Sequence, residues 1–257
     1  MDAYIVSLKT ASDRKKYMTS LLSSEKSITI NWIEAVDGRV FSDDEIDEKF
    51  DCKKFRQHYL KNPKPGEIGC TLSHQKCYNK LLQSSSKSVL ILEDDIVLND
   101  NIRDIIPKIE NILNTNKPII ILLSGWFWYL TKKEFDNNRQ LCKVCDGYLT
   151  HAYAINREAA QLMIEKKPYM LADAWELFIK KGVKIFGLTP HPIDQDWSGV
   201  FKSDVLTNAT PSKTFVLKSW IYHKQRGVKQ RFFKLIGHFE APRNMSTRVD
   251  EIKDALN

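Results

Sequence analysis

A continuous run of apolar residues that ends directly in three acids constrains the fold of this chain most. Residues 88–92 read SVLIL, and Glu93, Asp94 and Asp95 follow at once. A short apolar run bounded by a Ser/Lys-rich turn and by acids is typical of a central strand that is buried on both faces. We therefore expect carboxylates at the carboxyl end of a central strand, which is the edge where open α/β sheets bind their ligands.

Strand-like and helix-like segments alternate along most of the sequence. Apolar, β-branched runs predict strands at residues 4–8, 28–36, 88–92, 117–123, 151–155 and 183–188. Helical spacing and breaker residues predict helices from residue 12 or 13 onward and over about 67–82, 101–113 and 157–165. The acidic region 43–51 is expected to be a loop or a short helix. This alternation predicts an α/β/α sandwich of the Rossmann type with a mostly parallel sheet.

Size and composition predict one main domain over residues 1–210 and an appended segment over 211–257, because 257 residues with 42% hydrophobic content bury one large core or two modest ones. No secretory signal is visible. The longest apolar run is interrupted by Ser124 and Gly125, well short of the roughly 20 residues of a spanning helix, so we expect a soluble or peripheral protein. The five cysteines are expected to be free thiols in a reducing cytoplasm.

The acids at the end of the central strand have a direct chemical use. Carboxylate oxygens suit a hard divalent cation, Mn²⁺ or Mg²⁺, and such an ion neutralises a diphosphate leaving group. Asp95 is the first choice for the metal ligand. Glu93 or Asp94 would then face a ribose or a neighbouring loop, because successive strand side chains point in opposite directions. The alternative is that the acids only end the strand or cap the next helix.

Segments around these acids resemble a known family. They are Val6-Ser7-Leu8 with Asp13-Arg14, GEIGCTLSH at 66–74, ILEDDI at 91–96, THAYAI at 150–155, the Asp173 region, and Gln195 with Ser198. From residue 4 to about 205 the sequence resembles glycosyltransferase family 25, the lipooligosaccharide-biosynthesis galactosyltransferases. The resemblance implies a GT-A-like fold and inverting transfer of a sugar. The implied donor is UDP-galactose, and the acceptor is a lipooligosaccharide or lipopolysaccharide glycan.

The resemblance also implies a set of donor-binding residues: Ser7, Leu8, Arg14, Gly69, Ser73, His74, Glu93, Asp94, Gln195 and Ser198. Arg14 follows the first strand, where its guanidinium and the helix N-terminus can both reach phosphates, although a solvated surface arginine is equally common. Gly69 can allow close backbone approach to the donor. A histidine such as His74 is more often a hydrogen-bonded packing residue than a catalyst.

Inverting transfer needs a base that takes the proton of the acceptor hydroxyl. Asp173 and Glu176 are the candidates, and Asp173 is preferred because it occupies the acidic position of the family. Trp175 between them could stack on a sugar ring. The alternative is a capping Asp with an exposed Glu. His191 could complete the metal shell by analogy with GT-A enzymes, or it could be a turn histidine held between prolines.

The C-terminal segment alternates cations with aromatic and aliphatic residues from Lys218 onward. Together with the net charge of +7, this pattern favours an anionic inner-membrane surface as partner and a peripheral place on the cytoplasmic face of that membrane in a bacterium. The alternative is a helix that packs its aromatics on the domain. A basic aromatic tail also fits a nucleic-acid-binding protein, but the strand-end acids would repel phosphates, so no nucleic acid is expected. The oligomeric state is left open.

Overall fold

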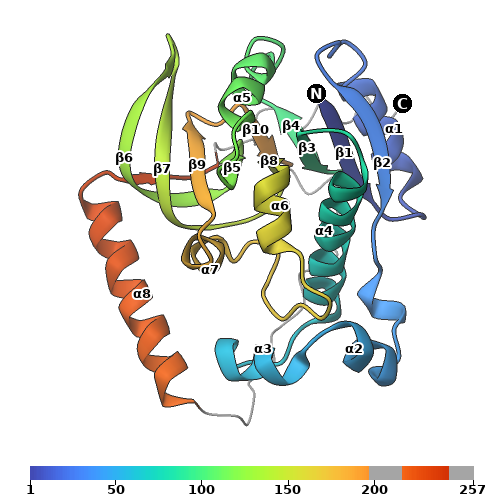
Figure 1. Ribbon diagram of the computed structural model, residues 1–257, viewed down its shortest axis with the longest axis vertical. Helices are drawn as coiled ribbons and strands as arrows, with labels where there is room; N and C mark the ends of the chain where they lie inside the picture. The colour runs from blue at the N-terminus through green and yellow to red at the C-terminus, as the bar shows by residue number, and fades with distance from the viewer. Residues whose placement is uncertain (197–215, 243–257) are drawn as a thin grey trace.

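A nine-stranded sheet organises the protein, whose computed structural model describes residues 1–196 and 216–242 (Figure 1). Its strands are β1 (Asp2–Ser7), β2 (Thr29–Glu34), β3 (Ser88–Glu93), β5 (Ile119–Leu122), β6 (Trp126–Asp136), β7 (Arg139–Tyr148), β8 (Ala152–Asn156), β9 (Lys184–Thr189) and β11 (Phe239–Glu240). They lie in the order β11-β6-β7-β9-β5-β8-β3-β1-β2. A separate antiparallel pair joins β4 (Ile96–Leu98) to β10 (Ile193–Gln195).

The sheet is mixed, and most of its strands run in the same direction. The pairings make β1, β2, β3, β5, β6 and β9 run in one direction, while β7, β8 and β11 run in the other. The expected mostly parallel sheet is therefore confirmed. The antiparallel strand β8 lies between β3 and β5.

Helices cover both faces of the sheet. The helices that contribute to the two main cores or pack at the sheet edge are α1 (Ser12–Leu21), α4 (Pro65–Gln83), α5 (Ile106–Leu113), α6 (Arg157–Met163), α7 (Trp175–Lys180) and α8 (Leu217–Leu235). Between β2 and α4 lie η1 (Gly38–Val40), α2 (Asp43–Lys49) and α3 (Cys52–Tyr59). One apolar core joins α4, α6 and α7 to the sheet, and a second joins α1 and α5 to its other face. Alternate residues of β1 and β3 enter different cores, as the pleat requires. The expected α/β/α sandwich is confirmed.

Several boundaries differ from the sequence-based expectation. The helix expected over 101–113 begins only at Ile106, with Pro107 in its first turn, because proline fits that position and not a helix interior. The acidic region 43–51 contains a short helix, one of its two expected forms, since Ser42 and Glu45 form a capping box at the start of α2. The long hairpin of β6 and β7 was not expected.

The structure also bears on two bulk expectations. Within residues 1–196 and 216–242, no helix has both the length and the apolar character needed to cross a membrane. All five cysteines are free, as expected. The expected boundary at residues 210 and 211 lies outside the described residues.

Candidate active site

The carboxyl ends of β1 and β3 meet at one edge of the sheet, because the two strands are parallel and Val6 lies opposite Glu93. Helix α1 starts shortly after β1 and carries Arg14 to this edge. The Arg14 Nη1 atom donates to Asp94 Oδ1 at 2.7 Å and to Asp95 Oδ2 at 3.3 Å. The structure thus brings three of the expected residues together, with Arg14 placed against acids.

The short pairing of β4 with β10 brings a late segment of the chain to the same place. Gln195 lies opposite Ile96, and its Nε2 atom donates to Asp95 Oδ2 at 3.1 Å. The backbone N–H of Asp196 donates to the Asp95 carbonyl oxygen at 2.8 Å. Gln195 therefore lies at the acidic edge, in contact with the expected metal ligand.

Asp95 is buried, and one oxygen of its carboxylate is not hydrogen-bonded. The residue is 6% exposed, and Oδ1 has no hydrogen-bond partner among the described residues. Burial raises its pKa to about 6, although the charge of Arg14 acts in the opposite direction. Burial also raises the pKa of Asp94. A buried carboxylate with an unpaired oxygen is the kind of group that a divalent cation stabilises, so the donor set fits Mn²⁺ or Mg²⁺.

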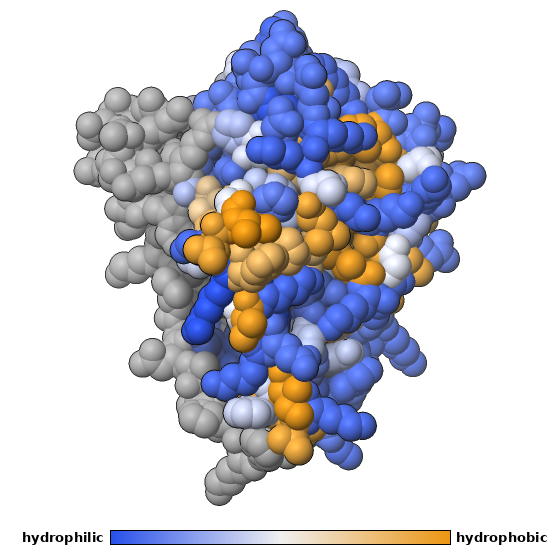
Figure 2. Space-filling view, turned by 90° about the vertical axis from the view of Figure 1, so that its left-hand side faces the viewer, coloured by the Kyte–Doolittle hydropathy of each residue, from blue (hydrophilic) through white to orange (hydrophobic). Residues whose placement is uncertain are grey.

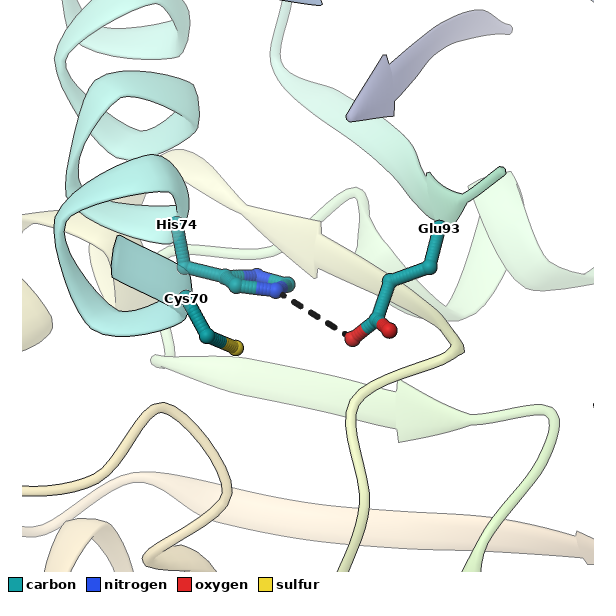
Figure 3. A group of neighbouring side chains, drawn as sticks. All are labelled: Cys70, His74 and Glu93. Carbon is teal, nitrogen blue, oxygen red and sulfur yellow. Dashed lines mark ion pairs between the residues drawn. The ribbon is translucent and has the colours of Figure 1, made fainter. Parts of the chain in front are cut away.

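The side chain of Glu93 points toward His74 of helix α4 (Figure 3). Its Oε1 atom lies 3.6 Å from His74 Nε2 and accepts a hydrogen bond from the Thr150 hydroxyl. Burial alone would raise the Glu93 pKa, but nearby His151, His74 and the Thr150 hydrogen bond together lower it to about 2. Glu93 therefore stays ionised across the physiological range.

His74 and Cys70 project from one face of α4 toward Glu93 (Figure 3). The Cys70 sulfur, a His74 ring nitrogen and a Glu93 carboxylate oxygen all lie within 4.8 Å of one another. His74 Nδ1 is 2.7 Å from the Tyr153 hydroxyl, which holds the imidazole ring in place, while Nε2 lacks a hydrogen-bond partner within the described part of the chain. Burial raises the pKa of the Cys70 thiol. The cluster lines the site and keeps its histidine oriented.

A pocket of about 120 Å³ opens beside these side chains. Six expected donor-binding residues line it: Ser7, Leu8, Ser73, His74, Glu93 and Asp94. The Ser73 hydroxyl also has a structural part, since it donates to the Gly69 carbonyl at 2.7 Å and accepts from the Val36 N–H at 2.8 Å. The pocket thus brings together six of the ten residues expected to bind the donor.

Backbone packing, rather than close approach to a donor, explains the glycine at position 69. A Cβ atom there would lie 2.5 Å from the Val36 carbonyl oxygen and 2.9 Å from the Gly38 nitrogen. Gly69 therefore allows α4 to pack directly on the backbone after β2. The expected role in donor approach does not hold for this position, which acts on the pocket only by fixing its wall.

The two candidate bases have different surroundings. Asp173 Oδ2 accepts a hydrogen bond from the Leu149 N–H at 2.9 Å, and burial raises the pKa of Asp173. Glu176 instead accepts from Lys180 at 3.0 Å and from the Tyr222 hydroxyl of α8. A raised pKa makes a carboxylate a better proton acceptor, and Glu176 is already engaged by Lys180 and Tyr222, so the surroundings favour Asp173 as the base.

Trp175 does not provide a sugar-stacking surface. Its side chain is fully buried in the core, and Nε1 donates to the Leu149 carbonyl oxygen at 2.9 Å. The expected stacking role is therefore wrong, because both ring faces pack inside the protein. Trp175 instead fixes the backbone next to Asp173.

His191 is held as a turn histidine. Its Nδ1 atom lies 3.1 Å from the Leu188 carbonyl oxygen, and Nε2 lies 2.6 Å from the Gly125 carbonyl oxygen. With both nitrogens on backbone oxygens, neither ring nitrogen is directed at a metal. The structure supports the packing alternative over the metal-ligand expectation.

A second histidine close to the acids is His151, which immediately precedes β8. It contributes to the pKa of both Glu93 and Asp95, and its Nδ1 atom has no hydrogen-bond partner among residues 1–196 and 216–242. The segment 150–155 belongs to the resemblance, but no role was predicted for its members. The signal for Thr150, His151 and Tyr153 was present in that segment, but their place beside β3 depends on strand order. Ser198 lies outside the described residues.

Comparisons with known proteins place most of the chain in one family. Residues 1–173 match the family described as glycosyltransferase family 25, LPS biosynthesis protein. A glycosyltransferase 25 family member from Aedes aegypti is 28% identical over 64% of this chain, and procollagen galactosyltransferase 2 from Homo sapiens is 25% identical over 65%. The matched part spans 28% of the length of each relative.

A solved Drosophila galactosyltransferase 7 mutant in complex with manganese, UDP-Gal and xylobiose aligns with a TM-score of 0.35 and 11% identity, covering 85% of this chain and 78% of that one. A likeness at this score supports no inference about the site. The family match covers the pocket, the acids and Asp173, and the chain belongs to glycosyltransferase family 25.

Proposed function

We propose that this chain is an inverting glycosyltransferase that moves galactose from UDP-galactose, in β linkage, onto a lipooligosaccharide or lipopolysaccharide glycan. The observation that carries the proposal is the buried Asp95 carboxylate, whose Oδ1 atom lacks a partner among the described residues, beside the pocket lined by Ser7 and Asp94. This combination suits a divalent cation and a diphosphate at the carboxyl edge of the sheet.

Different residues of the site would bind the metal, supply positive charge and accept the proton. Asp95, with Asp94 and His151 next to it, would hold Mn²⁺ or Mg²⁺, which when bound neutralises the charge of the leaving diphosphate. Arg14 supplies a further positive charge at this edge. Asp173 takes the proton of the attacking hydroxyl, and burial supports this role by raising its pKa.

A larger groove next to the pocket supports a glycan acceptor. The groove has a volume of about 1170 Å³ and shares Leu8, Val36 and Asp37 with the donor pocket. Five lysines line it, Lys9, Lys49, Lys76, Lys166 and Lys167, together with four acids, Glu34, Asp37, Glu48 and Glu165. Side chains that donate and accept hydrogen bonds suit the hydroxyl groups of a glycan.

Galactose is the donor sugar we test first, because one relative is named a procollagen galactosyltransferase. The purified chain is incubated with Mn²⁺ and a panel of UDP-sugars, and released UDP is measured with and without a lipooligosaccharide acceptor. We expect UDP-galactose to be turned over fastest, and EDTA to abolish the reaction. Equal turnover of all sugars would contradict the galactose assignment, and no turnover in the presence of acceptor would contradict the enzyme assignment.

A binding assay separates the enzyme from a nucleic-acid-binding protein. UDP with Mn²⁺ should raise the melting temperature of this chain, whereas single-stranded DNA should not. The reverse result would favour the nucleic-acid-binding alternative.

A further inference from the structure

Helix α8 packs on the rest of the protein through polar side chains. The Ser219 hydroxyl donates to the Gln57 carbonyl at 2.6 Å, and His223 Nε2 donates to the His58 carbonyl at 2.9 Å. Arg226 follows three positions later, so the three residues share one face of the helix. The inward face of α8 is therefore polar.

The strongest of these contacts is made to strand β7. Arg226 binds Asp146 with two nitrogens, at 2.6 Å to Oδ1 and 2.9 Å to Oδ2, and Gln230 Nε2 adds a third bond at 2.8 Å. Asp146 is 1% exposed. The Tyr222 hydroxyl also donates to Glu176 of α7. These contacts fix the rotation of α8 about its axis and so decide which side chains face outward.

The outward face carries large apolar side chains. The exposed fractions of its main members are Leu217 58%, Trp220 45%, Ile221 40%, Val228 67%, Phe232 56% and Leu235 86%. Figure 2 views the α8 side of the molecule and shows hydrophobic residues gathered among hydrophilic ones. A surface helix ordinarily has the opposite orientation, with its apolar stripe toward the core. An apolar stripe turned outward marks a binding surface.

The charge of the helix identifies the partner. Residues 217–235 contain six cations and no acid. Arg226 is paired with Asp146, and the others are Lys218, Lys224, Lys229, Arg231 and Lys234. We propose that the outward face of α8 lies on an anionic lipid leaflet, with its apolar side chains in the interface and its lysines and arginines at the headgroups.

A second copy of the chain fits this face less well. Two α8 helices packed face to face would bring together ten cations that have no ion-pair partner among the described residues, without an acid on either helix, and like charges across an interface oppose association. Binding of the outward face to lipid would leave the hydrogen bonds of α8 to Asp146 and Glu176 in place. Removing the tail would break those contacts, so substitutions on the outward face test the proposal more cleanly than truncation does.

The test measures binding of the full chain to vesicles by co-sedimentation, with no donor present, so its result is independent of the proposed enzyme activity. We expect binding to mixed phosphatidylglycerol and phosphatidylcholine vesicles at low salt, much weaker binding to phosphatidylcholine alone, and loss of binding as salt rises. A near-surface cation contributes about fivefold to binding. Lys224→Glu combined with Arg231→Glu should therefore weaken binding by about 100-fold or more.

Leu235→Ser combined with Phe232→Ser removes exposed apolar surface and should also weaken binding, by about tenfold or more. The matched controls are Leu162→Ser on α6 and the pair Lys26→Glu with Lys117→Glu, which alter exposed residues elsewhere and should bind as the unaltered chain does. Equal binding by α8 and control variants overturns the proposal. A dimer in sedimentation velocity that disappears in the Leu235 and Phe232 variant also overturns it, because the face then binds a second copy.

Discussion

Replacement of Asp95 by Asn should have opposite effects on stability with and without metal. The charged carboxylate destabilises the metal-free protein but is needed to bind the metal. Burial raises the Asp95 pKa from 3.8 to about 6. A raised folded-state pKa means that ionisation destabilises the folded protein, with no cost below pH 3.8 and the full cost above about pH 6. About two pKa units correspond to about 3 kcal/mol.

The amide keeps the shape of the side chain but removes this cost. It also loses the 3.3 Å contact to Arg14, although Arg14 keeps its 2.7 Å contact to Asp94. We therefore expect Asp95→Asn to raise the free energy of unfolding of the metal-free chain by about 1–3 kcal/mol at pH 8, and by almost nothing at pH 4. The exposed Asp104→Asn, a matched change of charge, should have no such effect.

Ligand addition should reverse the order of stability. A ligand at 100 times its dissociation constant stabilises the native state by about 2.7 kcal/mol. Mn²⁺ with UDP should thus stabilise the unaltered chain and the Asp104 variant, but not Asp95→Asn. Denaturant unfolding with EDTA, and then with Mn²⁺ and UDP, measures both effects. An equal ligand effect in Asp95→Asn would refute the metal assignment, and a less stable metal-free variant would refute the argument from buried charge.

Three further predictions concern the candidate bases, a contact of α8 and the packing of α4. Asp173→Asn should keep UDP and Mn²⁺ binding while turnover falls by about 100-fold or more, whereas Glu176→Gln should lower turnover less. Calorimetry measures the binding and UDP release measures the turnover. A larger loss of turnover in Glu176→Gln would make Glu176 the base. Burial and the charge of His223 lower the His58 pKa to about 4, so the stability of this contact with α8 is present above pH 6.5 and is lost as pH falls toward 4. After solvent screening we expect about 1–2 kcal/mol, absent in His58→Gln, and a flat difference between the two proteins from pH 7 to 4 would contradict it. Gly69→Ala should lower the free energy of unfolding by about 1–3 kcal/mol, because its Cβ would meet backbone atoms, and unchanged denaturant unfolding would refute that packing role.

The sequence was most informative where the structure is decided within a few residues. The apolar run at 88–92 is a buried strand because no other short element tolerates such a run at the centre of a sheet, and the acids follow from its end. The capping box that starts α2 also depends on neighbouring residues only, but the acidic composition of that region left a loop and a short helix equally open. The β6–β7 hairpin was missed because β6 is largely exposed after Tyr129 and lacks a clear apolar alternation.

The sequence by itself determined the class of fold, the strand that carries the acids, and the basic character of the C-terminal helix, because each depends on patterns that neighbouring residues complete. Only the tertiary structure decided the direction and partner of each side chain. Glu93 meets Thr150 across 57 residues, and Asp95 meets Gln195 across 100. Strand order sets these pairs, and it likewise brings His151 to the acids and leaves His191 on backbone oxygens. The outward turn of the apolar face of α8 has the same origin, since the buried Asp146 on β7 binds Arg226 and so fixes the rotation of the helix.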